Sequence, residues 1–474
     1  MTQKNQPPAG QDSSHLRTQA KFGARGILKR MWSDLRVILR VILRAKNDSP
    51  EQARFEIGAY EFREPDYRQI FQWAAALGDN PEVVVKVLGG TRFTSVRDGS
   101  TINFTVVEGR ILALVWDFAK LPLDAIPWCD GVSIHTLVYQ SDPPSKFFPR
   151  TFPLSLRNLV CNGLHLGALD LSKVPRLEEL YCRRNELAEL DLSAVPGLKR
   201  LDCGLNRLTQ LDLSPVPGLT ALYCRENQLT QLDLSRVPRL TTLDCCENQL
   251  TELDLSSVPG LTMLRCFMNP TTELDLSPVP GLTRIDCGLN QLKVLDLSPV
   301  PGLTALRCAM NKLTELDLSV VPGLTELRCD FNQLTDLDLS PVPGLGHLGC
   351  FKNRLTNLDL SPVPDLKSLY CDENLLTQLD LSPIPGLTEL RCGWNQLTEL
   401  DLSPVPELAK LDCRENQLTQ LDLSPVPRLR ELSCPENAFS ELDVRPLRQL
   451  ASLELSAHVR LIGTPPADCR VRRV

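Results

Sequence analysis

Cysteine is the residue type in this sequence whose number and spacing most directly suggest chemistry. Fourteen of the 17 cysteines lie 21 residues apart, from Cys161 to Cys434. Such a column of thiols could bind a soft metal ion or carry redox chemistry. No Cys-x-x-Cys pair occurs, however, and the five histidines follow no related spacing. Because a thiol is also a small apolar group, we interpret the column as buried structure and expect no metal and no cofactor.

The thiols also bear on the compartment. Free cysteines in this number are safest where glutathione keeps them reduced, and residues 1–15 lack the apolar segment of a secretory signal. We therefore expect a cytoplasmic protein, with an exported or injected effector as the alternative. Cys246 lies outside the column and is expected to point outward as an accessible thiol.

Aspartate forms a second column, nine residues after each column cysteine, from Asp170 to Asp443. Stacked carboxylates could form a calcium ladder, but the parallel β-rolls that bind calcium use Gly-rich GGxGxD turns. The turns here read Leu-Asp-Leu-Ser instead. We therefore expect each carboxylate to accept hydrogen bonds from backbone N–H groups of the next turn.

Columns of this kind need a supporting element that repeats every 21 residues. Within each unit, apolar and polar residues alternate, as in Leu222 and Cys224 against Tyr223 and Arg225, which predicts a strand with one buried face. One coil cannot shield its apolar side chains, so the coils must stack into one core. An asparagine three residues after nearly every column cysteine is interpreted as a structural ladder that satisfies backbone groups.

The unit reads LxxLxCxxNxLxxLDLxxxxx, and this pattern resembles the 21-residue class of bacterial leucine-rich repeat proteins. The resemblance covers residues 156–455, nearly two-thirds of the chain. It implies a mostly β leucine-rich repeat solenoid over 154–460, with a parallel sheet of about 15 strands. A coil of this length leaves no room for a full helix, so the convex side is expected to be extended or 3₁₀.

The outward positions that flank the cysteines vary from coil to coil, whereas the framework does not. Diversified outward residues on a constant solenoid are typical of a recognition surface. In the central coils these positions hold apolar and arginine residues, the composition of protein interfaces. The alternative is that these side chains only cover one another. The predicted partner-binding residues are Met263, Arg265, Phe267, Met268, Leu289, Arg307, Met310, Arg328, Phe331, Phe351, Arg391 and Trp394. The Pro270-Thr271 turn breaks the repeat among them, either as a functional mark or as drift.

The N-terminal third has a different character. Residues 1–15 are expected to be disordered, and residues 16–47 to form a basic amphipathic helix with Arg36, Arg40 and Arg44 on one stripe. That helix would contact an anionic membrane surface or dock on the unit behind it. Residues 50–150 are expected to form a small α+β domain that caps the solenoid, with a helix near 67–77 and a hairpin turning at Glu108-Gly109. Residues 461–474 are interpreted as a C-terminal tail.

No catalytic signature occurs, and fewer than thirty residues follow the array, so we expect no enzyme. The net charge of −7 argues against nucleic acid as a partner. The sequence therefore predicts a non-catalytic protein–protein interaction module that binds a protein partner on the strand face. The alternative is a secreted bacterial effector or a membrane-associated adaptor that uses the basic N-terminal helix.

Overall fold

The computed structural model describes residues 54–57, 60–77, 93–94, 101–102, 105–107, 110–117, 134–140 and 152–474. The chain divides into two compact units, Met1–Val160 and Cys161–Val474. The predictions for residues 1–15 and 16–47 lie outside the described residues. Within the described ranges, no helix is long and apolar enough to cross a membrane.

The first unit combines one helix with short strands. Strands β1 (Arg54–Ile57) and β2 (Tyr60–Arg63) form an antiparallel pair, and helix α2 spans Glu64–Leu77, which includes the segment predicted to be helical. Ile70 and Trp73 give this helix a fully buried face. Its remaining strands are β3 (Phe93–Thr94), β4 (Thr101–Ile102), β5 (Thr105–Val107), β6 (Arg110–Asp117), β7 (Thr136–Gln140) and β8 (Asn158–Val160). Strands β5 and β6 pair antiparallel about the predicted hairpin turn.

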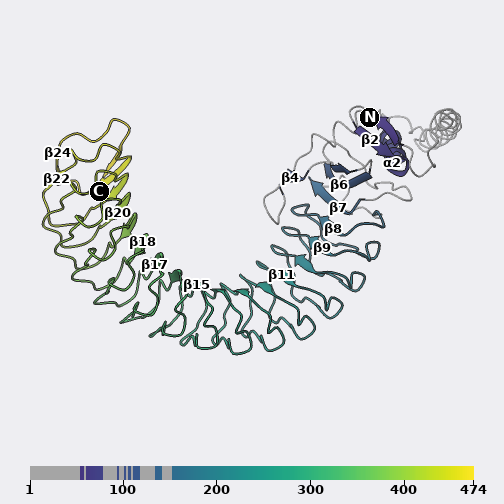
Figure 1. The fold of residues 1–474 in the computed structure, drawn as a ribbon, viewed down its shortest axis with the longest axis horizontal. Helices are drawn as coiled ribbons and strands as arrows, with labels where there is room; N and C mark the ends of the chain where they lie inside the picture. Colours follow the sequence, from purple (N-terminus) through teal and green to yellow (C-terminus); the bar gives the residue numbers. More distant parts are fainter. Residues whose placement is uncertain are drawn as a thin grey trace, which may run out of the picture. The chain divides into compact units, whose positions relative to one another are not determined.

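The second unit is a curved array of coils with one parallel sheet on its concave side (Figure 1). Each strand is in register with the strand of the next coil, so that Leu222 lies beside Leu243 and Tyr223 beside Asp244. The predicted solenoid with about 15 strands is confirmed. The strands are β9 (Glu179–Tyr181), β10 (Arg200–Asp202), β11 (Ala221–Tyr223), β12 (Thr242–Asp244), β13 (Met263–Arg265), β14 (Arg284–Asp286), β15 (Ala305–Arg307), β16 (Glu326–Arg328), β17 (His347–Gly349), β18 (Ser368–Tyr370), β19 (Glu389–Arg391), β20 (Lys410–Asp412), β21 (Glu431–Ser433), β23 (Ser452–Leu455) and β25 (Arg470–Arg473).

The convex side of the array consists of tight turns. Val216 donates from its N–H to the carbonyl of Leu213 at 3.0 Å, and Leu219 donates to Val216 at 3.0 Å. These i→i+3 bonds recur in the following coils, where a proline precedes the second donor by two residues. The turn is therefore fixed by local bonds, and it brings the chain back to the start of the next strand.

Asparagine side chains join successive coils within the core. The Nδ2 of Asn206 donates to the carbonyls of Cys203 and of Cys182, one coil back, at 2.9 and 3.0 Å. Its Oδ1 accepts from the N–H of Leu187 in the preceding coil at 3.1 Å. The same pattern recurs along the array, with the asparagines buried. The structural interpretation of this column is confirmed, because a buried polar group that satisfies backbone groups of two coils fixes their register.

The array continues beyond the recognisable repeats. Strand β25 pairs parallel with β23 and extends the main sheet into the segment interpreted as a C-terminal tail. On the convex side, β22 (Glu441–Asp443) pairs with β24 (Arg460–Ile462). The sequence of β25, Arg-Val-Arg-Arg, has no repeat motif, so the repeat pattern alone does not reveal this last strand.

Candidate functional site

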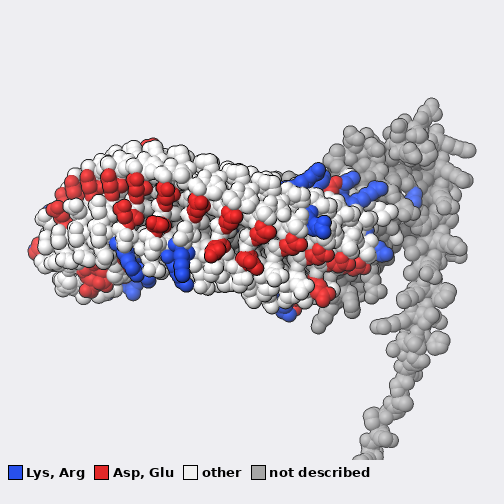
Figure 2. Space-filling view, turned by 90° about the horizontal axis from the view of Figure 1, so that it is seen from below, with Lys and Arg blue, Asp and Glu red and all other residues white. Residues whose placement is uncertain are grey.

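The aspartate column lies exposed on the convex side, where Figure 2 shows rows of carboxylates along the array. Asp338 accepts from the N–H of Ser340, two residues on, at 2.8 Å. The hydroxyl and the N–H of Ser340 hold the pKa of the Asp338 carboxyl below its ordinary value. Equivalent bonds occur in the other coils, so the expected hydrogen bonding to the next turn is confirmed. The column is therefore explained as turn structure.

The cysteine column is buried in the core. Cys203, Cys308 and Cys392 have no exposed surface, and burial raises the pKa of each thiol well above its ordinary value. Every cysteine within the described part of the chain is free. Across that same part, no three Cys, His, Asp or Glu side chains are grouped so that they could hold a metal ion. Each thiol in the column therefore packs as a small apolar side chain between the columns of leucines.

The expectation that Cys246 is accessible is wrong. Its side chain is buried, at 3 % exposure. The outward position after the column cysteine is covered in this coil, where the thiol lies beside the carboxylate of Asp244. Burial and that carboxylate raise the pKa of the Cys246 thiol. Among the described cysteines, the more exposed thiol is Cys469, near the end of the array.

Thiol labelling of the native protein should therefore be confined to few positions. We expect maleimide to modify Cys469 rapidly and to leave the peptides of the column cysteines and Cys246 unmodified until denaturant is added, because buried neutral thiols are poor nucleophiles. Mass spectrometry of the digested protein reads each position separately. Rapid native labelling of the column would contradict the packed core.

The twelve predicted partner-binding residues all lie on the concave side, in four outward columns. Met263 is the third residue before the column cysteine of its coil. The four arginines, Arg265, Arg307, Arg328 and Arg391, each directly precede a column cysteine. Phe267 and Phe351 directly follow their cysteines. The remaining five residues, two positions after the cysteine, are Met268, Leu289, Met310, Phe331 and Trp394. The first four of these come from consecutive coils, and we call them the apolar column.

The apolar column has an unfavourable backbone conformation. Met268, Leu289, Met310 and Phe331 have φ between 50° and 57°, in the left-handed region. Residues with a Cβ other than Asn and Asp adopt this region at a cost of roughly 1–2 kcal/mol. The first three side chains are also 48 %, 37 % and 38 % exposed. Neither backbone preference nor burial therefore accounts for the large apolar side chains at these positions.

Phe331 ends the apolar column in an aromatic cluster. Its ring meets that of Phe351 edge to face, with centroids 4.8 Å apart, and the ammonium of Lys352 lies 4.7 Å above it. Edge-to-face pairs of this kind contribute about 0.5–1.5 kcal/mol beyond their buried area.

Trp394 lies apart from the apolar column. Between them, the same position holds Lys352 and Glu373, which form an ion pair at 3.3 Å. The guanidinium of Arg414 lies 5.2 Å from the Trp394 ring centroid. The predicted site is thus two patches: the apolar column with its arginines, and a smaller patch at Trp394.

Most of the predicted arginines are held by neighbours within the sheet. Arg265 pairs with Asp244 at 3.0 Å, and Arg307 pairs with Glu326 at 2.8 Å. Arg328 and Arg391 lie on either side of the Tyr370 ring, at 5.6 and 5.1 Å from its centroid. Such partners restrict the side chains, so they would be preorganised for binding.

Two buried carboxylates directly follow column cysteines, just after strands β16 and β18. Asp330 is 4 % exposed and accepts from the N–H of Phe351 at 3.2 Å, and Asp372 is 8 % exposed and accepts from Gly393 at 3.1 Å. Burial raises the pKa of Asp330 to about 6 and that of Asp372 to about 7. Gly349 is needed here, since a Cβ would lie 2.7 Å from the Asp330 carboxylate.

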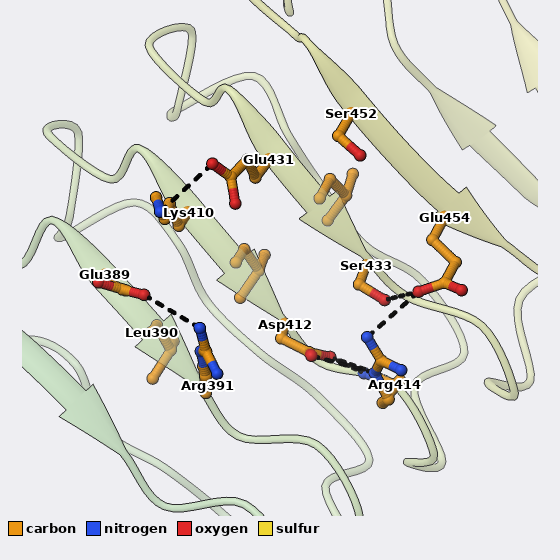
Figure 3. Close-up of a pocket in the computed structure, with 12 residues that line it drawn as sticks. Glu389, Leu390, Arg391, Lys410, Asp412, Arg414, Glu431, Ser433, Ser452 and Glu454 are labelled. Carbon is orange, nitrogen blue, oxygen red and sulfur yellow. Dashed lines mark hydrogen bonds and ion pairs between the residues drawn. The ribbon is translucent and has the colours of Figure 1, made fainter. Parts of the chain in front are cut away.

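A shallow depression of 280 Å³ lies farther along the sheet, over β19 to β23. The small side chains of Ser433 and Ser452 leave the space, and charged side chains form its walls (Figure 3). Those charges pair with one another: Arg414 binds Asp412 and Glu454 at 2.9 and 3.2 Å, and Ser433 donates to Glu454. The depression therefore offers no uncompensated charge to a ligand.

Comparison with known proteins identifies the architecture. No family model matches the chain, and no curated protein sequence matches it. Among solved structures, the functional domain of InlJ from Listeria monocytogenes, which includes a cysteine ladder, is 37 % identical over 62 % of this chain, with a TM-score of 0.61. The chain is a leucine-rich repeat protein. The matched region spans 66 % of the InlJ chain.

Two further structures share the leucine-rich repeat fold. YopM, a leucine-rich effector protein from Yersinia pestis, is 26 % identical to this chain, with a TM-score of 0.55. The match covers 72 % of this chain and 88 % of the YopM chain. The plant peptide hormone receptor RGFR1, solved in complex with RGF2, is 21 % identical, with a TM-score of 0.56. The match covers 74 % of this chain and 67 % of the receptor chain. At that identity the receptor shows the fold alone. This repeat fold is generally non-catalytic.

The irregular turn of this leucine-rich repeat array is compensated locally. Pro270 has no N–H, so it cannot make the bond that Gln249 makes to Leu229 in the preceding coil. The hydroxyl of Thr271 donates to the carbonyl of Leu250 instead, at 3.0 Å. One buried acceptor, Oδ1 of Asn290, has no partner within the described structure. This arrangement favours drift in one repeat over a functional mark.

Sequence reasoning missed several neighbours of the predicted site. Tyr370, which lies between two of the predicted arginines, and Lys352, above Phe331, belong to the same variable columns but carry no apolar or arginine signal. The cations Arg284 and Lys312 lie in coils of the apolar column, and Arg354 lies in the next coil. All of these residues occupy variable outward positions of the repeat, and this shared position could have identified them from the sequence.

Proposed function

We propose that this leucine-rich repeat protein is a non-catalytic binding module that captures a protein partner on its central surface. The central surface comprises the outward side chains of the coils of β13 to β17, at positions between Met263 and Arg354. One observation carries the proposal: three of the four side chains of the apolar column, Met268, Leu289 and Met310, are exposed and lie in a backbone conformation that disfavours them. Interface formation would bury these side chains and account for their presence.

The surroundings of the apolar column support the same function. Exposed methionine and leucine beside aromatic and arginine side chains match the composition of interface cores. The arginines are restrained by carboxylates and by Tyr370, so little entropy is lost when they bind. A concave sheet also presents these side chains together to one partner.

An exported effector is a second candidate. It is favoured by the likeness to YopM, which is described as a leucine-rich effector protein. The buried free thiols support a reducing compartment, the cytoplasm, as the place of action. Both candidates use the same surface, and they differ in how the protein reaches its partner.

A triple variant, Met268→Asn, Leu289→Asn and Met310→Asn, tests the surface. Asparagine tolerates the left-handed conformation, so we expect unchanged or higher thermal stability, with a gain of up to about 1 kcal/mol per site. Removing three exposed apolar side chains should weaken partner capture at least about tenfold. The measurement is capture from the native host, quantified by mass spectrometry and paired with the melting temperature.

The matched control is Glu415→Asn with Glu436→Asn. Both residues occupy the same left-handed position, with φ of 51° and 53°, on the acidic coils farther along the array. The control should also be stable and should keep full capture. If the triple variant retains every partner that the control retains, the central surface is not the binding site.

A further inference from the structure

The outward positions that flank the column cysteines have an uneven charge distribution. Each coil has five such positions: the third and first residues before the column cysteine, and the first, second and fourth residues after it. At these positions, the coils of β13 to β17 together hold seven cations and three carboxylates. The coils of β9 to β12 hold five cations and six carboxylates, and those of β18 to β21 hold three and seven. The central surface is therefore a basic patch within a protein of net charge −7.

Several of the central cations are free to bind an anion. No carboxylate lies within ion-pair distance of Arg284, Lys312 or Arg354 among the described residues. Lys312 has only a neutral partner, the side-chain oxygen of Gln291 at 3.3 Å. By contrast, Arg307 and Lys352 in the same coils are paired with Glu326 and Glu373.

Two of the three free cations, Arg284 and Lys312, share coils with the apolar column, and Arg354 lies in the next coil. Arg284 begins the strand that leads to Leu289, and Lys312 follows Met310 by two residues. A single ligand segment on this surface would therefore meet apolar side chains and unpaired cations within the same coil. The convex side presents its aspartate column instead, so its charge repels an anionic ligand and directs it to the concave side (Figure 2).

We propose that the partner segment bound by the central surface is acidic and amphipathic: a stretch of another protein in which Asp or Glu alternates with large apolar residues. This inference rests on the proposed function and adds the chemistry of the partner. The carboxylates pair with Arg284, Lys312 and Arg354, and the apolar side chains pack on Met268, Leu289 and Met310. A protein is favoured over nucleic acid, because the exposed groups are aliphatic and the two phenylalanine rings pack edge to face against each other.

Selection of random peptides displayed on phage against the full-length protein tests this chemistry without a known partner. We expect the selected peptides to be enriched in Asp and Glu together with Leu, Phe, Met or Trp. Synthetic versions of them should bind at low salt and weaken as salt rises. The charge-reversed variant Arg284→Glu, Lys312→Glu and Arg354→Glu should bind them at least about tenfold less tightly.

The matched control is Arg236→Glu, Arg239→Glu and Arg448→Glu. This control changes the net charge by the same amount as the charge-reversed variant, at exposed positions outside the central surface. At a salt concentration that screens long-range charge interactions, its affinity for the peptides should stay within about twofold of the wild-type affinity. Equal loss in both variants would indicate a general charge effect and would overturn the assigned cations.

The remaining outcomes separate this inference from the proposed function. If the selected peptides are basic or uncharged but no longer bind the Asn triple variant, the acidic partner is overturned and the proposed binding surface stands. Peptides that bind the Asn triple variant fully, or the absence of any enrichment, count against both. A single-stranded oligonucleotide that binds more tightly than every peptide would replace the protein partner. Self-association abolished by the charge reversal would identify a second copy as the acidic ligand.

Discussion

Replacing Asn332 by alanine should lower the free energy of unfolding by about 3 kcal/mol or more. Its Nδ2 donates to the carbonyls of Cys308 and Cys329 at 3.1 and 3.0 Å, and its Oδ1 accepts from the N–H of Leu313 at 3.0 Å. Alanine leaves three buried backbone groups in two coils without this partner, at about 1–3 kcal/mol each before relaxation. Urea unfolding followed by circular dichroism measures the change.

Asn290 provides an internal comparison for this prediction. It makes the same donations, to Cys266 and Cys287, but its Oδ1 has no partner because the preceding coil contains the Pro270-Thr271 turn. Asn290→Ala should therefore cost about 1 kcal/mol less than Asn332→Ala. The exposed Gln417→Ala should change stability by less than about 0.5 kcal/mol. Equal values for all three variants would show that the asparagine ladder does not hold the coils together.

The second large effect is pH-dependent. Burial and, to a smaller extent, the nearby Asp412 carboxylate raise the pKa of Asp372 to about 7, although the N–H of Gly393 and the charge of Arg391 act in the opposite direction. A raised pKa means that the folded state favours the protonated form. This contribution is fully present below the unfolded pKa of about 4 and is lost as pH rises through about 7. The wild-type protein should therefore lose stability between these limits.

Asp372→Asn isolates this contribution. Asparagine keeps the acceptor for Gly393 and removes the buried charge. We expect the variant to be more stable than the wild type by up to about 4 kcal/mol at pH 8, and equal to it at pH 4, since one pKa unit corresponds to about 1.4 kcal/mol. The exposed Asp338→Asn is the control, because its pKa is lowered and it should gain nothing at pH 8. Stability differences for Asp372→Asn that do not change with pH would contradict a buried, neutral carboxyl.

The repeated framework could be predicted from the sequence because each of its columns obeys one local rule. The leucines and Cys203 alternate with outward residues, so the strand and its buried face follow from the pattern. The asparagine column follows from its turn position in the same way. Strand β25 could not be predicted, since its pairing depends on the preceding coils and its own residues are basic.

The proposed recognition surface could be located from repeat position, but its chemistry could be predicted only in part. The outward columns identify the side chains that we propose to face a partner. The burial of Cys246, the separation of Trp394 from the apolar column and the placement of Tyr370 between two arginines depend on contacts between different coils. Such contacts depend on which side chains are neighbours in three dimensions. The left-handed backbone at Met310 also depends on the coil geometry, because methionine has no preference for it.

Site-specific photo-crosslinking tests the central claim most directly. A photoreactive amino acid replaces Met310 on the apolar column in one protein and Val294, 66 % exposed in the second half of its coil, in another. Irradiation in the native host should link a protein partner through position 310 and none through position 294, and the Asn substitutions at positions 268 and 289 should reduce that product at least about tenfold. Crosslinks formed equally from both positions, or from position 294 alone, would contradict a partner bound on the central surface.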